Sequence, residues 1–418
     1  MVVLLGVASL EGACSSAQDN GGADGGVGDR DASPAPGSDA SSAGDATYVA
    51  DASDATSRDA SGDPLDAAQA DAPDAPDAPD APDATDAHDA APPSLGLDCS
   101  SDGGDAGNVG ANGAPILLGC TGLYSVWPSR TITTAARAFD PGLHLWSDGS
   151  DKSRWILLPP GTQIDTSNMD EWVFPVGTKI WKEFRQSASQ GGKKIETRLL
   201  WKRAAGDWVR TTYAWSQDQT TATQLTTGAL NVWGTTYEIP TQEACTTCHQ
   251  GRIDGVLGFE AVSLASPGAS GLTMAALVSA GLVTAAPSGS LAIPGNATES
   301  AALGWLHANC GTACHSRSPS SFAGTTGLWM RLDVARLGSV AATDTYTTSV
   351  NVASSFQPAP NAGYLRIKPG DVTKSAIPFR DGTRDDQGQN FQMPPIDTHL
   401  VDDAGVAAVK AWVASLPP

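Results

Sequence analysis

Residues 15–98 limit what this 418-residue chain can fold into, because they consist almost wholly of Asp, Ala, Gly, Ser and Pro. The stretch holds 19 Asp against two Arg, and from Asp71 it repeats Asp-Ala-Pro four times. It has too few large apolar side chains to offset the entropy lost on ordering, and its like charges and frequent Pro favour an extended chain. We therefore predict a disordered acidic linker at 15–98.

The acidity of the chain belongs mainly to this linker. The formal net charge is −21 for the whole chain and −17 for residues 15–98. Residues 99–418 carry 26 acidic and 23 basic side chains and contain no concentrated basic stretch. A nucleic-acid-binding protein needs a basic surface, so we expect no nucleic acid partner.

The N-terminal segment, residues 1–14, is an apolar run from Met1 to Leu10 followed by Gly12-Ala13-Cys14. An apolar run that ends in small residues before a cysteine resembles a bacterial lipoprotein signal, in which that cysteine carries the lipid. Glu11 and the lack of a preceding Lys or Arg depart from this pattern, so an ordinary secretory signal is the alternative. Both interpretations predict export, and the first predicts a periplasmic or outer-membrane lipoprotein anchored through Cys14.

Residues 99–239 form a Trp-rich region, with nine of the twelve Trp between Trp127 and Trp233. Alternating apolar residues around the turn Gly206-Asp207 predict a hairpin over Ile195–Trp215. Short strands at this spacing favour a β-sandwich, and a disulfide between Cys99 and Cys120 is expected to close the loop that leads into it. Further strands are expected at Ser153–Leu158, Glu171–Phe174, Thr178–Arg185 and Asn231–Glu238.

In the region 240–299, Cys245-Thr246-Thr247-Cys248-His249 places a His directly after two thiols. Thiols at this spacing reach the two vinyl groups of one haem, and the adjacent His can ligate its iron. The alternatives are a redox disulfide or half of a zinc site, but neither explains His249, and zinc needs further ligands. We predict haem c on Cys245 and Cys248, with His249 as an axial ligand.

A second motif, Cys310-Gly311-Thr312-Ala313-Cys314-His315, follows a helix expected over Ser300–Ala308. It predicts a second haem on Cys310 and Cys314 with His315 as axial ligand, and a structural disulfide is the alternative. Met393-Pro394-Pro395 precedes an amphipathic helix expected from Asp402, an arrangement that resembles class I cytochrome c domains. The resemblance implies that Met393 is the other ligand of the second iron. The other ligand of the first iron stays open among Met274, His307, His144, Met330, His399 and a vacant position.

Residues 120–418 resemble a family of bacterial dihaem c-type cytochromes of largely uncharacterised role, in which the second pair of cysteines usually encloses two residues rather than three. The resemblance implies electron transfer at the cell envelope, with redox proteins there as partners. It is carried by Leu145-Trp146-Ser147-Asp148-Gly149, Trp172-Val173-Phe174-Pro175-Val176-Gly177-Thr178, Cys245–His249, Val256-Leu257-Gly258-Phe259, Leu306-His307-Ala308-Asn309-Cys310 and Met393-Pro394-Pro395.

The expected fold class is therefore α+β and multidomain. A β-sandwich-like domain would precede mainly α-helical cytochrome c-type domains, the last of them at 300–418. The expected function is that of an exported, metal-binding dihaem electron carrier. The alternatives are a dihaem peroxidase-like enzyme with one open haem site, and a ligand-binding β module coupled to haem redox chemistry.

Overall fold

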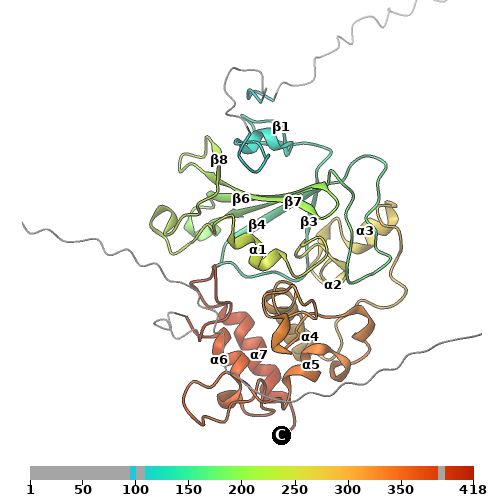
Figure 1. The fold of residues 1–418 in the computed structure, drawn as a ribbon, viewed down its shortest axis with the longest axis vertical. Coiled ribbons are helices and arrows are strands. Elements are labelled where there is room, and N and C mark those ends of the chain that lie inside the picture. The colour runs from blue at the N-terminus through green and yellow to red at the C-terminus, as the bar shows by residue number, and fades with distance from the viewer. Residues whose placement is uncertain (1–94, 100–108, 385–390) are drawn as a thin grey trace, which may run out of the picture. The chain divides into compact units, whose positions relative to one another are not determined.

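Seven antiparallel strands form the central sheet of the structure, a computed structural model that describes residues 95–99, 109–384 and 391–418. The strand order is β8-β7-β6-β5-β4-β3-β9, so most neighbours in the sheet are also neighbours in the chain (Figure 1). The strands are β3 (Arg137–Asp140), β4 (Asp151–Leu157), β5 (Lys179–Arg185), β6 (Lys194–Ala204), β7 (Asp207–Trp215), β8 (Ala222–Leu225) and β9 (Ser270–Gly271). A separate two-stranded sheet pairs β1 (Tyr124–Val126) with β2 (Thr131–Ile132).

The remaining elements are short helices and turns. The α-helices are α1 (Ala244–His249), α2 (Ala261–Ala265), α3 (Met274–Ser279), α4 (Ala297–Leu306), α5 (Asp344–Ser349), α6 (Ala376–Asp381) and α7 (Asp403–Ser415). A π-helical turn, η4 (His307–Gly311), continues α4. The 3₁₀ turns are η1 (Leu118–Thr121), η2 (Ala188–Gln190), η3 (Val232–Gly234), η5 (Gly324–Thr326), η6 (Val334–Arg336), η7 (Val340–Ala342) and η8 (Val372–Lys374).

The central sheet buries side chains on both faces. On one face the sheet and the η1–β1 segment share a hydrophobic cluster that includes Leu118, Leu123, Trp181, Leu199 and Tyr213. On the opposite face the sheet packs against α2, α3 and the loops beside them, in a cluster that includes Ile156, Ile180, Leu200, Phe259 and Leu277. Segments outside the sheet therefore supply the apolar partners of both faces.

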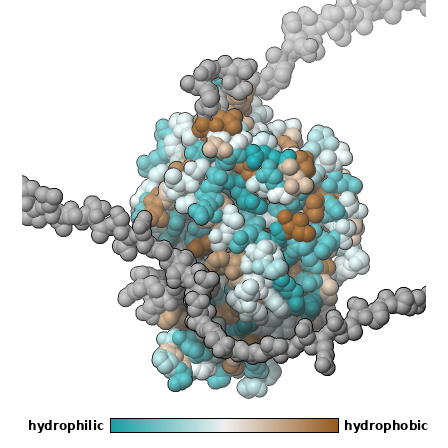
Figure 2. Space-filling model, viewed as in Figure 1, coloured by the Kyte–Doolittle hydropathy of each residue, from teal (hydrophilic) through white to brown (hydrophobic). Residues whose placement is uncertain are grey.

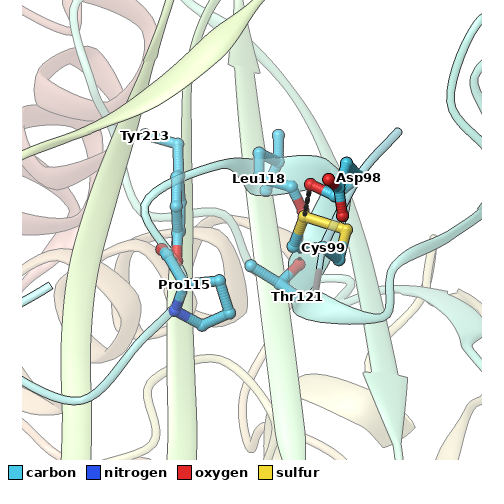
Figure 3. Close-up of a disulfide and its surroundings, with 7 residues drawn as sticks. Asp98, Cys99, Pro115, Leu118, Thr121 and Tyr213 are labelled. Carbon is cyan, nitrogen blue, oxygen red and sulfur yellow. Dashed lines mark hydrogen bonds between the residues drawn. A yellow bond between two sulfur atoms is a disulfide. The ribbon is translucent and has the colours of Figure 1, made fainter. Parts of the chain in front are cut away.

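A disulfide and a hydrogen bond hold the segment that leads into η1, next to the first hydrophobic cluster. A disulfide joins Cys99 and Cys120, and the Cys120 sulfur lies 3.9 Å from the carbonyl oxygen of Asp98 (Figure 3). Tyr213 of β7 donates its hydroxyl hydrogen to the carbonyl of Pro115, at 2.7 Å. The Tyr213 hydrogen bond attaches the segment before η1 to β7, and the disulfide links η1 to Cys99.

Helices α4 and α7 pack together in a further hydrophobic core, in addition to the two clusters on the faces of the sheet. This core includes Leu303, Leu306, Val409, Trp412 and Val413. Trp305 of α4 donates to the carboxylate of Asp402, at 2.7 Å, and Asp402 is the N-cap of α7. The helix expected over Ser300–Ala308 and the helix expected from Asp402 are confirmed, although the first begins three residues earlier than predicted.

The expected fold class was wrong in two respects. The Trp-rich strands form one seven-stranded antiparallel sheet rather than a β-sandwich. The C-terminal part is not a mainly α-helical cytochrome c-type domain, because its helices α5 and α6 have only six residues each and are separated by turns. Alternating apolar residues show that a strand has a buried face, but not whether a second sheet, a helix or a loop covers that face.

Two of the expected strands were also wrong, and the others are confirmed. Residues 171–174 form only an isolated bridge between Asp165 and Val173, and residues 231–238 contain η3 instead of a strand. The hairpin over Ile195–Trp215 is present as β6 and β7, and β4 and β5 match the other two predicted strands. The failed segments lie near Gly or Pro residues, which favour turns.

The signal segment with Cys14, and the acidic linker except for residues 95–98, lie outside the described residues. Among the described residues, none of the helices combines the length and the apolar character needed to cross a membrane. On the face viewed in Figure 2, hydrophobic residues occur in small groups among hydrophilic ones.

Candidate functional site

The first Cys-His motif occupies helix α1, which spans Ala244–His249. Within one short helix, Cys245, Cys248 and His249 are all half-buried and line one small cavity together. Nδ1 of the His249 imidazole makes a short hydrogen bond with the carbonyl oxygen of Gly255. The motif and the loop after it therefore hold the imidazole in one orientation.

The second motif follows α4 and begins inside the π-helical turn His307–Gly311. The amide of His315 donates to the carbonyl of Cys310 at 2.8 Å, and the amide of Cys314 donates to the same oxygen at 3.2 Å. A π-helical turn has more residues than an α-helical turn, so it accommodates the extra residue between the two cysteines. Nδ1 of His315 lies 3.2 Å from the carbonyl oxygen of Leu328.

The two imidazoles have the same protonation pattern. A carbonyl oxygen only accepts hydrogen bonds, so Nδ1 of His249 and of His315 carries the hydrogen, and Nε2 keeps its lone pair. Burial is the largest effect on both groups, lowering the pKa of His249 to about 3 and that of His315 to about 4. Both side chains are therefore neutral at pH 7, as a metal-ligating imidazole must be.

The fold brings one cysteine of each motif together. Cys248 and Cys314 line the same cavity, and interaction with Cys314 together with burial raises the pKa of Cys248 above its ordinary value. Cys310 instead packs in the core between α4 and α7. All four motif cysteines are free thiols in the structure.

A larger cavity adjoins these thiols and is bounded by the sheet, α1 and the turn after η4. Cys248, His249 and Cys314 lie on its wall, while Cys310 and His315 are not among its lining residues. Much of the remaining wall is apolar and excludes water from this side of the motifs; it includes Leu143, Leu145, Leu200, Val256, Pro394 and Pro395.

Cations from the sheet complete the cavity wall, and sequence reasoning missed them. Arg154, Lys182 and Arg198 line the larger cavity, and Arg210 lines the smaller one beside Cys245 and His249. The Nε atom of Arg210 is buried without a hydrogen-bond partner in the described structure. The available sequence signal was that basic residues stand next to buried Trp or Leu residues in the strands. This signal does not show that the cations lie side by side, because their alignment depends on how the strands pair.

The first motif fits a covalently bound haem. Two thiols and a neutral imidazole, whose Nε2 has no partner among the described residues, lie on adjoining cavity walls. Apolar side chains and the buried, unpaired Nε of Arg210 lie beside them. The second motif shares the imidazole arrangement, although the thiol of Cys310 points into the core. The first motif therefore suits haem, whereas the second has the same residue types but places Cys310 and His315 off the cavity wall.

Asp254 connects the loop after the first motif to the sheet. Its carboxylate accepts hydrogen bonds from the Lys202 ammonium at 2.7 and 2.9 Å, and from the Trp208 indole at 3.0 Å. The amide of Phe174 donates to the same carboxylate at 2.7 Å. Because Asp254 precedes Gly255, this buried ion pair also fixes the carbonyl that orients His249.

His307 has a structural role that the sequence left open. Its side chain is fully buried, and its Nδ1 accepts a hydrogen bond from the amide of Leu332 at 2.9 Å. Its Nε2 lies 3.3 Å from the carboxylate of Glu260. Both ring nitrogens are engaged within the protein, so His307 is not free to ligate iron in this structure.

The other open ligand candidates lie apart from the cavity wall. Met274 is buried in the cluster between the sheet and helices α2 and α3, and Met330 is buried in the core of α4 and α7. Neither lines the cavity beside His249. His144 and His399 are more exposed and pair with carboxylates, His144 with Asp140 at 3.3 Å and His399 with Glu238 at 2.9 Å. None of these four residues is therefore placed as a ligand for the first motif.

Met393 lies in the loop before α7. Its amide donates to the carbonyl of Arg380 at 3.0 Å, and its own carbonyl accepts a hydrogen bond from Arg384 at 3.0 Å. The next two residues, Pro394 and Pro395, line the larger cavity, whereas Met393 is not among its lining residues. Its assignment as an iron ligand stays a prediction.

The expectation of a metal-binding protein of the cytochrome c kind needs correction. Throughout the described ranges, no group of three or more His, Cys, Asp or Glu side chains could hold a metal ion. The architecture around the motifs is a sheet with short helices rather than a helical cytochrome c domain. Short sequence motifs indicate local chemistry, but they do not specify the domain that presents them.

Comparisons with protein-family models, curated proteins and solved structures found no match to this chain.

Proposed function

We propose that this chain is an electron-transfer protein that holds haem covalently at both Cys-His motifs. The supporting observation is that His249 and His315 both direct Nδ1–H to a backbone carbonyl and keep Nε2 available. An imidazole held in this way is oriented and made more basic, which suits an iron ligand. The porphyrin supplies four nitrogen ligands itself, so the proposal needs no cluster of protein ligands.

Each motif supplies two thiols for attachment. Cys245 and Cys248 would hold one haem and Cys310 and Cys314 the other, each thiol adding its sulfur to one carbon of a vinyl group and its hydrogen to the other. When bound, haem supplies one-electron redox chemistry. Leu200, Val256 and the other apolar wall residues keep water away from the group, and the cations of the sheet favour its more negative, reduced form.

This proposal agrees with the resemblance of residues 120–418 to dihaem c-type cytochromes in their sequence motifs, and it places those motifs on a different architecture. The partners would be redox proteins of the cell envelope. A chain that carries a thioether-bound cofactor and a disulfide fits an oxidising compartment, because structural disulfides persist there.

The proposed location depends on Cys14, which we propose as the lipidated residue of an exported lipoprotein. Cys14→Ser is expected to move most of the protein from the membrane fraction to the soluble fraction, because a lost acyl anchor removes the membrane affinity. The measurement is immunoblotting of separated fractions, with Ser15→Ala as the matched control. Unchanged membrane association of Cys14→Ser would show that Cys14 carries no lipid.

Replacing Met393, the proposed ligand of the second iron, tests whether the protein is an electron carrier or an enzyme with an open haem. Met393→Ala is expected to lower the reduction equilibrium constant of one haem about tenfold or more, which is about 59 mV for one electron. The variant should also bind more carbon monoxide than the unmodified protein, because the substitution opens the iron that Met393 would ligate. Redox titration and optical spectra measure both effects.

Met169→Ala is the control, because Met169 packs beside the core of the sheet and lines neither of the cavities beside the motifs. It should leave the potentials and the carbon monoxide response unchanged. Rapid binding of carbon monoxide by the unmodified protein, together with turnover of peroxide, would replace the carrier with a peroxidase-like enzyme.

A further inference from the structure

A row of three cations crosses the face of the sheet that lines the larger cavity. Arg154 on β4 lies opposite Lys182 on β5, and Lys182 lies opposite Arg198 on β6. Residues paired directly across neighbouring strands point to the same face of a sheet. All three line the cavity that also contains Cys248, His249 and Cys314.

Two of the three cations have carboxylate partners within the protein. Arg198 makes a bidentate pair with Glu196, with N–O distances of 2.9 and 2.7 Å, and Arg154 pairs with Asp140. Lys182 has neither an ion pair nor a hydrogen bond with any residue that the structure describes. The Lys182 ammonium lies 4.9 Å from the centroid of the Phe184 ring, but no carboxylate among the described residues forms an ion pair with it.

The neighbours of Lys182 increase this imbalance. Like charges directly opposite each other on adjacent strands destabilise a sheet. A further cation, Lys152, lies nearby and donates to the carbonyl of Ser150 at 3.2 Å. Burial, followed by the charges of Arg154, Lys152 and Arg198, lowers the pKa of Lys182 well below its ordinary value. An anion in the cavity would offset both the repulsion and the cost of burial.

We propose that Lys182, with Arg154 and Arg198 on either side, binds a carboxylate group in the cavity beside His249. The proposal rests on the proposed function in one respect, because a propionate of the haem held by Cys245 and Cys248 is one source of that carboxylate. The other source is a free small carboxylic acid, which would enter the same cavity. Both sources present the same chemistry to the three cations.

The test compares full-length protein carrying Lys182→Gln, Lys182→Met or Lys182→Arg with the unmodified protein. Lys410→Gln is the matched control, because Lys410 is exposed on α7, away from the cavity. If the carboxylate is a propionate, both neutral variants should lower the reduction equilibrium constant of one haem about tenfold, or 59 mV. Loss of a nearby positive charge disfavours the added electron, and Lys182→Arg should restore the value.

A calorimetric titration with succinate identifies the second source. If the site takes a free acid, the unmodified protein should bind succinate, and Lys182→Gln should weaken that binding at least tenfold. The succinate titration does not depend on haem, so it still decides the proposal if mass spectrometry finds no covalent haem. The proposal is overturned if both neutral variants match Lys410→Gln in reduction potential and in succinate binding.

Discussion

Intact protein, denatured and analysed by mass spectrometry, should carry about 1,230 Da beyond its polypeptide mass, because two haems of ~616 Da each remain attached through thioether bonds. Replacing Cys245 and Cys248 together by Ala should remove one haem, and replacing Cys310 and Cys314 should remove the other. Each double variant should therefore lose about half of the added mass, since attachment at one motif does not use the thiols of the other.

The disulfide provides the control for these variants. Cys99 and Cys120 lie on the opposite side of the sheet from the motifs, so replacing both by Ala should leave the full added mass in place. Retention of one haem, with Cys310 and Cys314 unmodified, would restrict the proposed function to the first motif. The absence of any added mass, with Cys248 linked to Cys314 as a disulfide, would contradict it entirely.

Asp254→Asn should be the most destabilising conservative substitution near the site. Lys202 and Asp254 are each 3% exposed, so neutralising Asp254 leaves the Lys202 ammonium buried without its counter-ion. Removing one partner of a buried ion pair costs about 3–5 kcal/mol of the free energy of unfolding. Urea denaturation followed by Trp fluorescence measures the change.

Asp151→Asn is the matched control, because Asp151 is exposed at the start of β4. Its unfolding midpoint should stay close to that of the unmodified protein. Asp254→Asn should also weaken the hydrogen bond that orients the His249 imidazole, because Asp254 fixes the loop that contains Gly255. Equal midpoints for the two variants would show that the ion pair does not stabilise the fold.

Local sequence patterns predicted the elements that carry the candidate site. The second motif follows helix α4 as expected, and β6 and β7 form a hairpin at the predicted turn. These elements depend on spacing, turn residues and periodicity over fewer than about 20 neighbouring residues, and such signals are readable from one sequence. The β-sandwich and the helical C-terminal domain were wrong, because both required knowledge of which surfaces pack together.

Sequence alone determined which residues have the chemistry for this site: paired thiols with adjacent imidazoles. Tertiary structure decided which of them meet. It placed Cys248 beside Cys314, buried His307 between Leu332 and Glu260, and aligned Arg154, Lys182 and Arg198 across three strands. Thiols and imidazoles have the same chemistry in any fold, whereas contacts between distant segments depend on strand register and core packing, which no local pattern specifies.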